Sequence, residues 1–166
     1  MVIARFFKHA CSGHWLVRRD FPQTTLDAIS QAVKDCEQHH PGEIRFVIEG
    51  ALHPAAVWAG QTPRQRAVEV FAQQRIWDTE HNNGVLIYLL LADRAVEIVA
   101  DRYVARGRVP QSQWDAACRE IERHFREGRF EAGAVAGVQA VAAILAQYPP
   151  GPKDAGNELP DAPLVL

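Results

Sequence analysis

The chain of 166 residues is 48% hydrophobic and 23% charged, which is enough for one globular domain with a buried core. Its net charge of −2 and the lack of a basic stripe argue against nucleic acid or anionic lipid as the main partner, since both select clustered lysine and arginine. Its three cysteines form no Cys-x-x-Cys pair, which is typical of a reducing compartment.

Two apolar stretches bear on location. The first residues contain no long apolar core ahead of a small-residue cleavage site, so we expect no signal peptide. The stretch from Ala132 to Ala146 is shorter than the roughly 20 residues that a membrane-spanning helix needs. We therefore expect a cytoplasmic protein with no direct membrane insertion.

The first predicted helix runs from Phe21 to His40. Thr24 and Asp27 have the spacing of a capping box, with Asp in place of Glu. Pro41-Gly42 ends this helix, and a strand is predicted from Glu43 to Glu49. In this strand the apolar residues Ile44, Phe46 and Ile48 alternate with the other residues.

A second helix and a central strand follow the connection from Gly50 to Gly60. Thr62-Pro63 has the form of an N-cap and a first-turn proline, and this helix runs to about Trp77. Val85 to Leu91 is an unbroken apolar run, which predicts a strand buried on both faces. Strand, helix and strand form a crossover unit, so the two strands should be parallel and their connection right-handed.

The central strand is predicted to begin at a sharp turn and to end in a hairpin. Asn82-Asn83-Gly84 supplies residues that tolerate positive φ. Ala95 to Ala100 is rich in β-forming residues and predicts the returning strand, with Asp93 and Arg94 near the hairpin tip.

Two helices and a tail complete the chain. Val109-Pro110 leads into an amphipathic helix that Gly128 ends. Phe130 to Tyr148 predicts a last helix that is apolar on nearly every side. We expect a single domain over residues 1–148 and a Pro-rich extended C-terminal tail over residues 149–166, whose last three residues dock on the surface.

Four short motifs surround the predicted hairpin. They are Asn82-Asn83-Gly84-Val85-Leu86-Ile87-Tyr88, Ala92-Asp93-Arg94, Val96-Glu97-Ile98 and Ala100-Asp101-Arg102. Together they resemble the signature of the TPM-domain family, which includes a thylakoid-lumen acid phosphatase. The match extends upstream through residues 40–45 and 77–80 and downstream to the last helix, so it covers most of the chain. The chain is similar to the short bacterial branch of the family, which lacks a signal peptide and a membrane anchor.

This resemblance implies an α/β fold, a three-layer α/β/α sandwich around a small mixed sheet with a parallel crossover and a central hairpin. It also implies divalent-metal binding and the weak phosphatase activity of some members, although most members have no established activity. Membrane anchors among the relatives suggest a membrane-associated protein partner. Two positions depart from the family. Where the family has a short motif that contains an aspartate, this chain has Arg18 to Pro22, so no acidic ligand is assigned there. Tyr103 follows the second Asp-Arg, where relatives usually have glycine.

The predicted topology gathers polar residues at both ends of the sheet. Parallel pairing sets Glu43 beside the start of the central strand, and the antiparallel return brings Asp101 to the same end. Because several segments converge there, we predict a ligand-binding site formed by Glu43, Asp78, Glu80, Asn82, Asn83, Asp101 and Arg102. Of these, Glu43, Glu80 and Asp101 are the candidate ligands for Ca²⁺ or Mg²⁺, which bind oxygen atoms. The second choice is the opposite end, which the rule for open α/β sheets favours, with Glu49, Asp93 and Arg94.

Two functions of different classes stay open. The first is a non-catalytic module that binds a protein partner or a small ligand. The second is a metal-assisted phosphoester hydrolase, in which the three carboxylates hold the cation and Arg102 offsets phosphate charge. The first is favoured, since the sequence has no Gly-rich phosphate loop, no nucleophile elbow and no zinc-type histidine spacing. A structural alternative is an ion-pair network of Glu43, Arg45, Asp101 and Arg102.

Overall fold

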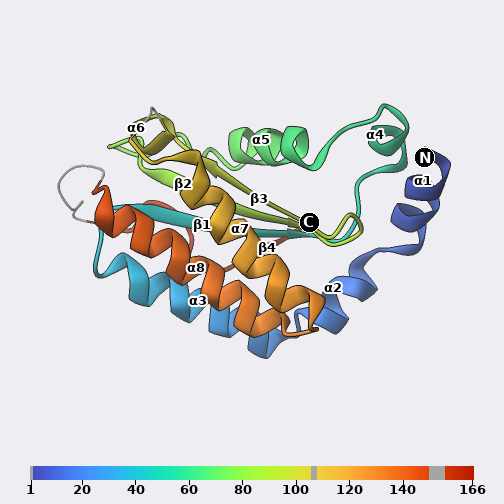
Figure 1. The fold of residues 1–166 in the computed structure, drawn as a ribbon, viewed down its shortest axis with the longest axis horizontal. Coiled ribbons are helices and arrows are strands. Elements are labelled where there is room, and N and C mark those ends of the chain that lie inside the picture. The colour runs from blue at the N-terminus through green and yellow to red at the C-terminus, as the bar shows by residue number, and fades with distance from the viewer. Residues whose placement is uncertain (1, 106–107, 150–155) are drawn as a thin grey trace.

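The computed structural model describes residues 2–105, 108–149 and 156–166, and its centre is a four-stranded mixed sheet. The strands are β1 (Glu43–Glu49), β2 (Gly84–Leu90), β3 (Ala95–Ala100) and β4 (Leu164–Val165), in the order β3-β2-β1-β4. β1 is parallel to both β2 and β4, whereas β2 and β3 form an antiparallel hairpin (Figure 1). The predicted parallel crossover and central hairpin are therefore confirmed.

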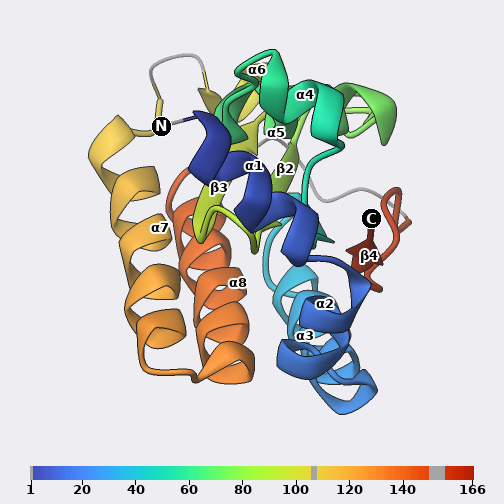
Figure 2. The ribbon, with the colours of Figure 1, turned by 90° about the vertical axis from the view of Figure 1, so that its right-hand side faces the viewer.

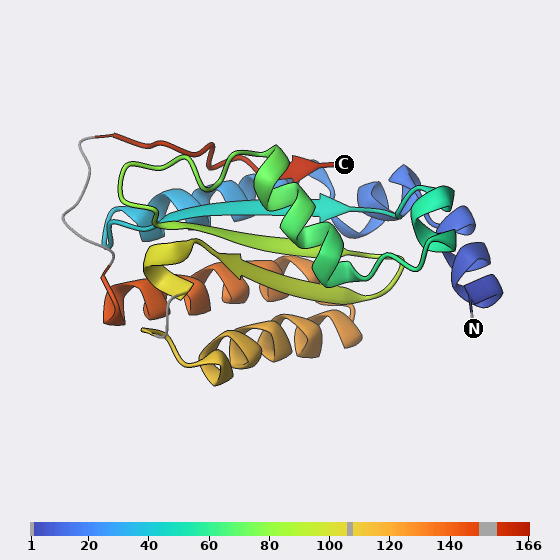
Figure 3. The same cartoon turned by 90° about the horizontal axis from the view of Figure 1, so that it is seen from above.

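Helices cover both faces of this sheet. They are α1 (Val2–Cys11), α2 (His14–Asp20), α3 (Gln23–Glu37), α4 (Pro54–Trp58), α5 (Pro63–Gln73), α6 (Arg102–Ala105), α7 (Gln111–Arg126) and α8 (Phe130–Gln147). α3, α7 and α8 lie on one face, and α5 crosses the other (Figures 1 and 3). This arrangement is the three-layer α/β/α sandwich that the resemblance implied.

The two central strands are buried along their whole length, because apolar clusters lie on both sides of the sheet. Every residue of β1 and β2 is buried. Ile44, Phe46 and Ile48 belong to the cluster beneath α3, α7 and α8, whereas Val47 and Tyr88 belong to the cluster on the α5 side. The alternation in the sequence of β1 therefore separates two parts of the core.

Helix starts were predicted with mixed success. Thr62 caps α5 in a capping box with Gln65, with the Thr62 Oγ1 accepting from the Gln65 N–H at 3.2 Å and the Gln65 Oε1 accepting from the Thr62 N–H at 2.9 Å. The predicted capping box of Thr24 and Asp27 is wrong. α3 begins one residue before Thr24, after Pro22, and no side chain caps it. Proline fixes its own φ and ends the preceding turn, so the chain enters α3 without a side-chain cap.

The described part of the C-terminal tail lies along β1. Leu164 and Val165 pair in parallel with Val47 and Ile48, so the predicted docking of the last residues takes the form of a strand. Arg45 is buried and donates from Nη1 to the carbonyl oxygens of Pro160 at 2.8 Å and Ala162 at 2.5 Å. Residues 156–166 therefore extend the sheet and cover the Glu43 and Arg45 side chains of β1.

α8 is the central helix of the layer formed by α3, α7 and α8. Its residues 130–147 are apolar and long enough to span a membrane by length and composition alone. In this fold the helix is instead packed between α3 and α7, and its buried residues include Gly133 and Gly137. A Cβ on Gly137 would lie 2.4 Å from Cδ1 of Ile121, so the glycine allows α7 to approach. The packing is that of a core helix.

Residues 2–20 form two helices that were not predicted. Figure 2 shows α2 beside the start of α3 and α1 beside α4. α4 itself lies in the segment predicted as a plain connection. All three are short, and α1 is tied to the hairpin tip by contacts between Arg5 and Asp93, 88 residues apart in sequence. Such elements depend on distant partners, which local periodicity does not reveal.

Candidate functional site

The site predicted first lies at the end of the sheet where β1 and β2 begin, hereafter the amino end. Asn82 adopts a positive φ of 52°, as predicted for this turn, and its Oδ1 accepts from Nη2 of Arg102 at 2.8 Å. Asn83 is fully buried, and its amide nitrogen donates to the carbonyl oxygen of Pro41. The Asp101 N–H donates to the Gly84 carbonyl at 2.9 Å, which extends the hairpin ladder by one residue. The structure thus brings Asn82, Asn83, Asp101 and Arg102 together.

Asp101 caps a helix with one carboxylate oxygen, whereas its other carboxylate oxygen accepts no hydrogen bond from the described residues. Its Oδ1 accepts from the N–H of Arg102 at 2.6 Å, and its carbonyl oxygen accepts from Val104 and Ala105, so it begins α6. Its Oδ2 is buried and has no hydrogen-bond donor in the described part of the chain. Oδ1 of Asn83 is in the same condition. A buried acceptor without a donor is costly in free energy, so a water or a cation at either atom would be stabilising.

Beside these residues is a small cavity of about 370 Å³ lined by Asn82, Arg102, Tyr103 and Arg108. The guanidinium carbon of Arg108 lies 3.8 Å from the ring centroid of Tyr103. Tyr103, which departs from the family pattern, therefore supplies a flat surface on which Arg108 stacks. The described lining contains two guanidinium groups, an amide and a phenol, and no carboxylate. These groups suit an anion.

Glu43 lies at the same end of the sheet, but its side chain belongs to a separate cluster of carboxylates, which also contains Glu37, Glu158 and Asp161. It pairs with Gly84, and Asp101 follows on the next strand, so Glu43 and Asp101 are two strands, roughly 10 Å, apart. The Glu43 side chain is buried under the tail, where Oε2 accepts from the Leu159 N–H at 3.1 Å. Burial raises the pKa of Glu43, and the carboxylates of Glu158 and Asp161 raise it further against the backbone hydrogen bonds, which lower it.

The other predicted residues do not join these groups. Asp78 is exposed and pairs with Arg75 at 2.5 Å, and Glu80 is exposed, with its N–H donating to the Glu158 carboxylate. Within residues 2–105, 108–149 and 156–166, no three His, Cys, Asp or Glu side chains are placed to hold a metal ion, so Glu43, Glu80 and Asp101 form no such group. The alternative ion-pair network forms only in part: Arg102 pairs with Asp101 at 3.9 Å, whereas Arg45 binds the carbonyl oxygens of the tail.

Sequence reasoning missed the cluster's other carboxylates. Glu37, at the end of α3, accepts from the N–H of Ile44 at 2.8 Å. Its pKa is raised to about 8, first by burial and then by the carboxylates of Glu43 and Asp161, against the Ile44 hydrogen bond, which lowers it. Glu158 and Asp161 come from the tail. Nothing in their local sequence indicates that the tail folds back over β1.

Replacing Glu37 by Gln is expected to change how stability depends on pH. A carboxyl group whose pKa is raised by folding stabilises the protein fully below its unfolded value of about 4.5, and this contribution is lost as the pH rises through about 8. Gln keeps the acceptor for Ile44 and cannot ionise. The variant should therefore melt about 4 °C or more above the parent at pH 8.5 and close to it at pH 5. Thermal unfolding monitored by circular dichroism measures this, with the exposed Asp35→Asn as the control. Parallel pH profiles of parent and Glu37→Gln would contradict the assignment.

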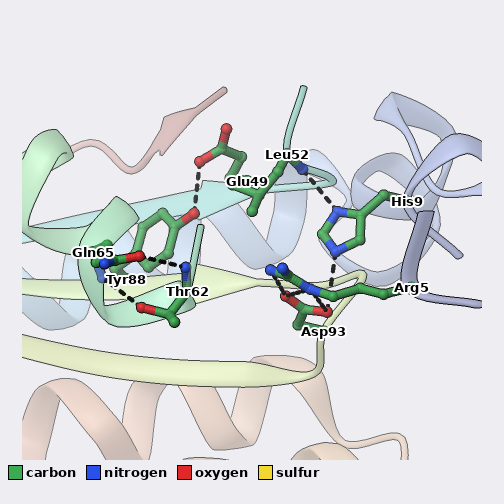
Figure 4. A network of polar contacts seen from close by, with 8 residues as sticks. All are labelled: Arg5, His9, Glu49, Leu52, Thr62, Gln65, Tyr88 and Asp93. Atoms are coloured by element: carbon green, nitrogen blue, oxygen red, sulfur yellow. Dashed lines mark hydrogen bonds and ion pairs between the residues drawn. The ribbon is translucent and has the colours of Figure 1, made fainter. Parts of the chain in front are cut away.

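At the opposite end of the sheet, hereafter the carboxyl end, the second-choice residue Glu49 is buried, and Figure 4 shows its carboxylate bonded to the hydroxyl of Tyr88. Its carboxylate accepts from Nε of Arg66 at 2.9 Å, from Nη2 of Arg66 at 3.2 Å and from the hydroxyl of Tyr88 at 2.6 Å. Burial raises the pKa of Tyr88, and the Glu49 carboxylate raises it further. A cavity of about 830 Å³ borders Glu49 and Arg66, between α4 and α5.

The other second-choice residues lie at the hairpin tip. Asp93 accepts three hydrogen bonds from Arg5 and one from Nε2 of His9 at 3.0 Å, and Nδ1 of His9 accepts from the Leu52 N–H at 2.9 Å (Figure 4). Burial alone would raise the pKa of Asp93, but the hydrogen bonds from Arg5 and His9 outweigh it and lower the pKa. Arg94 has a positive φ of 53° in the turn. Both His9 nitrogens are occupied, which leaves neither available as a base.

The layered sheet and the polar groups at its two ends define a small α/β sandwich domain with candidate ligand sites at strand termini. A family model described as the TPM domain matches residues 21–144. The chain belongs to the TPM-domain family. It is 30% identical to the BA42 protein of the psychrophilic bacterium Bizionia argentinensis, whose structure was determined by NMR. That structure superposes with a TM-score of 0.74 over 86% of this chain and 93% of its own. No curated protein matches significantly.

Proposed function

We propose that this TPM-domain protein is a non-catalytic binding module that takes an anionic ligand, such as a phosphate group, at the amino end of its sheet. The observation that supports this most is the small cavity lined by Asn82, Arg102, Tyr103 and Arg108. Guanidinium groups bind phosphate through paired N–H donors, and stacking on Tyr103 holds Arg108 in place. The ligand would be a small molecule or a group on a protein partner, in the cytoplasm.

Titration of the purified protein with inorganic phosphate tests this proposal. Arg102→Gln and Arg108→Gln should each weaken binding about tenfold, because each removes one charge-assisted contact to the anion. Arg75→Gln is the matched control, since Arg75 is 71% exposed in its side chain and pairs with Asp78 outside the cavity. Equal affinities of all four proteins, or no binding by the parent, would refute the proposal.

A metal-assisted phosphoester hydrolase is the second candidate. It is favoured by the two buried acceptors without donors, Oδ2 of Asp101 and Oδ1 of Asn83, which offer oxygen ligands to Ca²⁺ or Mg²⁺ next to Arg102. Asp101→Asn keeps the cap of α6 and removes the charge. It should abolish cation binding in a calorimetric titration and cation-dependent phosphatase turnover, whereas Asp93→Asn at the carboxyl end should leave both intact. Turnover that Asp101→Asn does not change would exclude this function.

A further inference from the structure

α1 is attached to the domain by its polar side. Arg5 and His9, one turn apart, both point to Asp93 at the hairpin tip, and His9 is only 4% exposed (Figure 4). Phe6 lies between them and packs against the cluster on the α5 side. In an ordinary surface helix the apolar stripe faces the core. Here the contacts with the core are made largely by charged and polar groups.

The opposite side of α1 is apolar and exposed. Ile3 is 64% exposed and Phe7, one turn later on the same side, is 62% exposed. Ala4, Ala10 and Cys11 are exposed as well. Trp58 of the adjacent α4 is 68% exposed and meets Phe6 edge-on, with ring centroids 6.4 Å apart. We call Ile3, Phe7 and Trp58 the apolar corner. The helices that carry them, α1 and α4, lie beside each other at the carboxyl end of the sheet (Figures 1 and 2).

The charged side chains of residues 1–20 and 50–61 that have no ion-pair partner among the described residues are positive. Residues 1–20 contain four lysine and arginine side chains and one carboxylate, that of Asp20. Arg19 pairs with Asp20 and Arg5 with Asp93, whereas no carboxylate of the described residues pairs with Lys8 or Arg18, which are both exposed. Residues 50–61, which include α4, contain no Asp, Glu, Lys or Arg. The net negative charge of the chain therefore lies elsewhere.

We propose that the apolar corner adsorbs to an anionic lipid bilayer, with α1 lying in the plane of the interface. Exposed Phe, Ile and Trp beside Lys and Arg are the composition of helices that bind the headgroup region, and tryptophan is enriched there. A second copy of the chain fits this corner less well, because both copies would bring the unpaired positive charges of Lys8 and Arg18 to the contact. The overall charge of −2 conceals this local basic surface. The surface is separate from the proposed anion site at the amino end.

Co-sedimentation with vesicles tests this surface. The full chain should sediment with vesicles of phosphatidylcholine mixed with phosphatidylglycerol, and much less with phosphatidylcholine alone. Ile3→Ser combined with Phe7→Ser should weaken binding to the anionic vesicles roughly tenfold or more, because the apolar area that enters the interface is lost. Lys8→Glu combined with Arg18→Glu should also weaken it, and added salt should weaken binding by the parent.

Matched tryptophan variants separate this surface from exposed aromatic residues in general. Trp58→Ser should weaken vesicle binding, whereas Trp77→Ser, which is 45% exposed in the connection leading to the amino end, should not. All changed side chains are exposed, so unfolding curves should match the parent. Binding that is absent, indifferent to lipid charge, or unchanged in the Ile3 and Phe7 double variant would overturn the proposal. So would a dimer that this double variant converts to a monomer in light scattering without vesicle binding by the parent.

Discussion

Gly84→Ala is expected to destabilise the protein by about 3 kcal/mol or more. An added Cβ would lie 2.2 Å from the carbonyl oxygen of Ile76 and 2.8 Å from its Cγ2. The backbone cannot easily move away, because Gly84 pairs with Glu43 on one side and its carbonyl oxygen accepts from Asp101 on the other. The central strand would have to shift between two neighbours that hold it in register.

Equilibrium unfolding in urea measures this loss. Gly13→Ala is the matched control, since nothing lies within 4 Å of its added Cβ and its φ of −155° is open to any residue. That variant should stay within about 1 kcal/mol of the parent, because Gly13 is the N-cap of α2 and alanine caps a helix less well than glycine. Similar values for the two variants would mean that the Ile76 carbonyl does not limit the start of β2.

Arg66→Met is expected to cost about 3 kcal/mol, because it leaves the Glu49 carboxylate buried without its cation. The side chains of Glu49 and Arg66 are 9% and 19% exposed, and two hydrogen bonds join them. Among the described residues, only the hydroxyl of Tyr88 would remain as a donor to this carboxylate. Methionine retains much of the apolar stem, so the lost free energy reports on the charge rather than on packing.

Two comparisons isolate the buried charge. Arg75→Met removes the ion pair between Arg75 and Asp78, whose side chains are 71% and 47% exposed, respectively. This variant should lose less than about 1 kcal/mol of stability. Adding Glu49→Gln to Arg66→Met should recover part of the loss, because the unpaired charge is then gone. If the double variant is as unstable as Arg66→Met alone, the loss arises from packing. Urea unfolding of the three variants at neutral pH distinguishes these cases.

The sheet and its main helices were predictable because their signals are local. The apolar run that forms β2, the turn at Asn82 and the proline after Thr62 each act within a few residues. Once the strand order along the chain is known, parallel and antiparallel pairing bring Glu43, Gly84 and Asp101 to one edge without further information.

The remaining features depend on contacts between distant segments. α1 is held by Asp93 and Leu52, and the carboxylate cluster exists only because Glu158 and Asp161 fold back beside Glu43. The pairing of Glu49 with Arg66 likewise joins the end of β1 to α5. No periodicity or short motif encodes such pairs. The sequence therefore predicted which segments lie at each end of the sheet, but not which side chains are in contact there.

β4 also limits the pairing of this sheet with strands of other molecules. A strand at the edge of a sheet exposes N–H and C=O groups that can pair with a strand from another molecule. β4 takes up part of the outer side of β1, and the Leu166 N–H donates to the Ile48 carbonyl at 2.9 Å. β4 is only two residues long and directly follows Pro163, which has no N–H to offer. On the other edge, Arg64 donates to the Ile98 carbonyl of β3. Both edges are thus poor templates for strand addition, which protects this small sheet from aggregation.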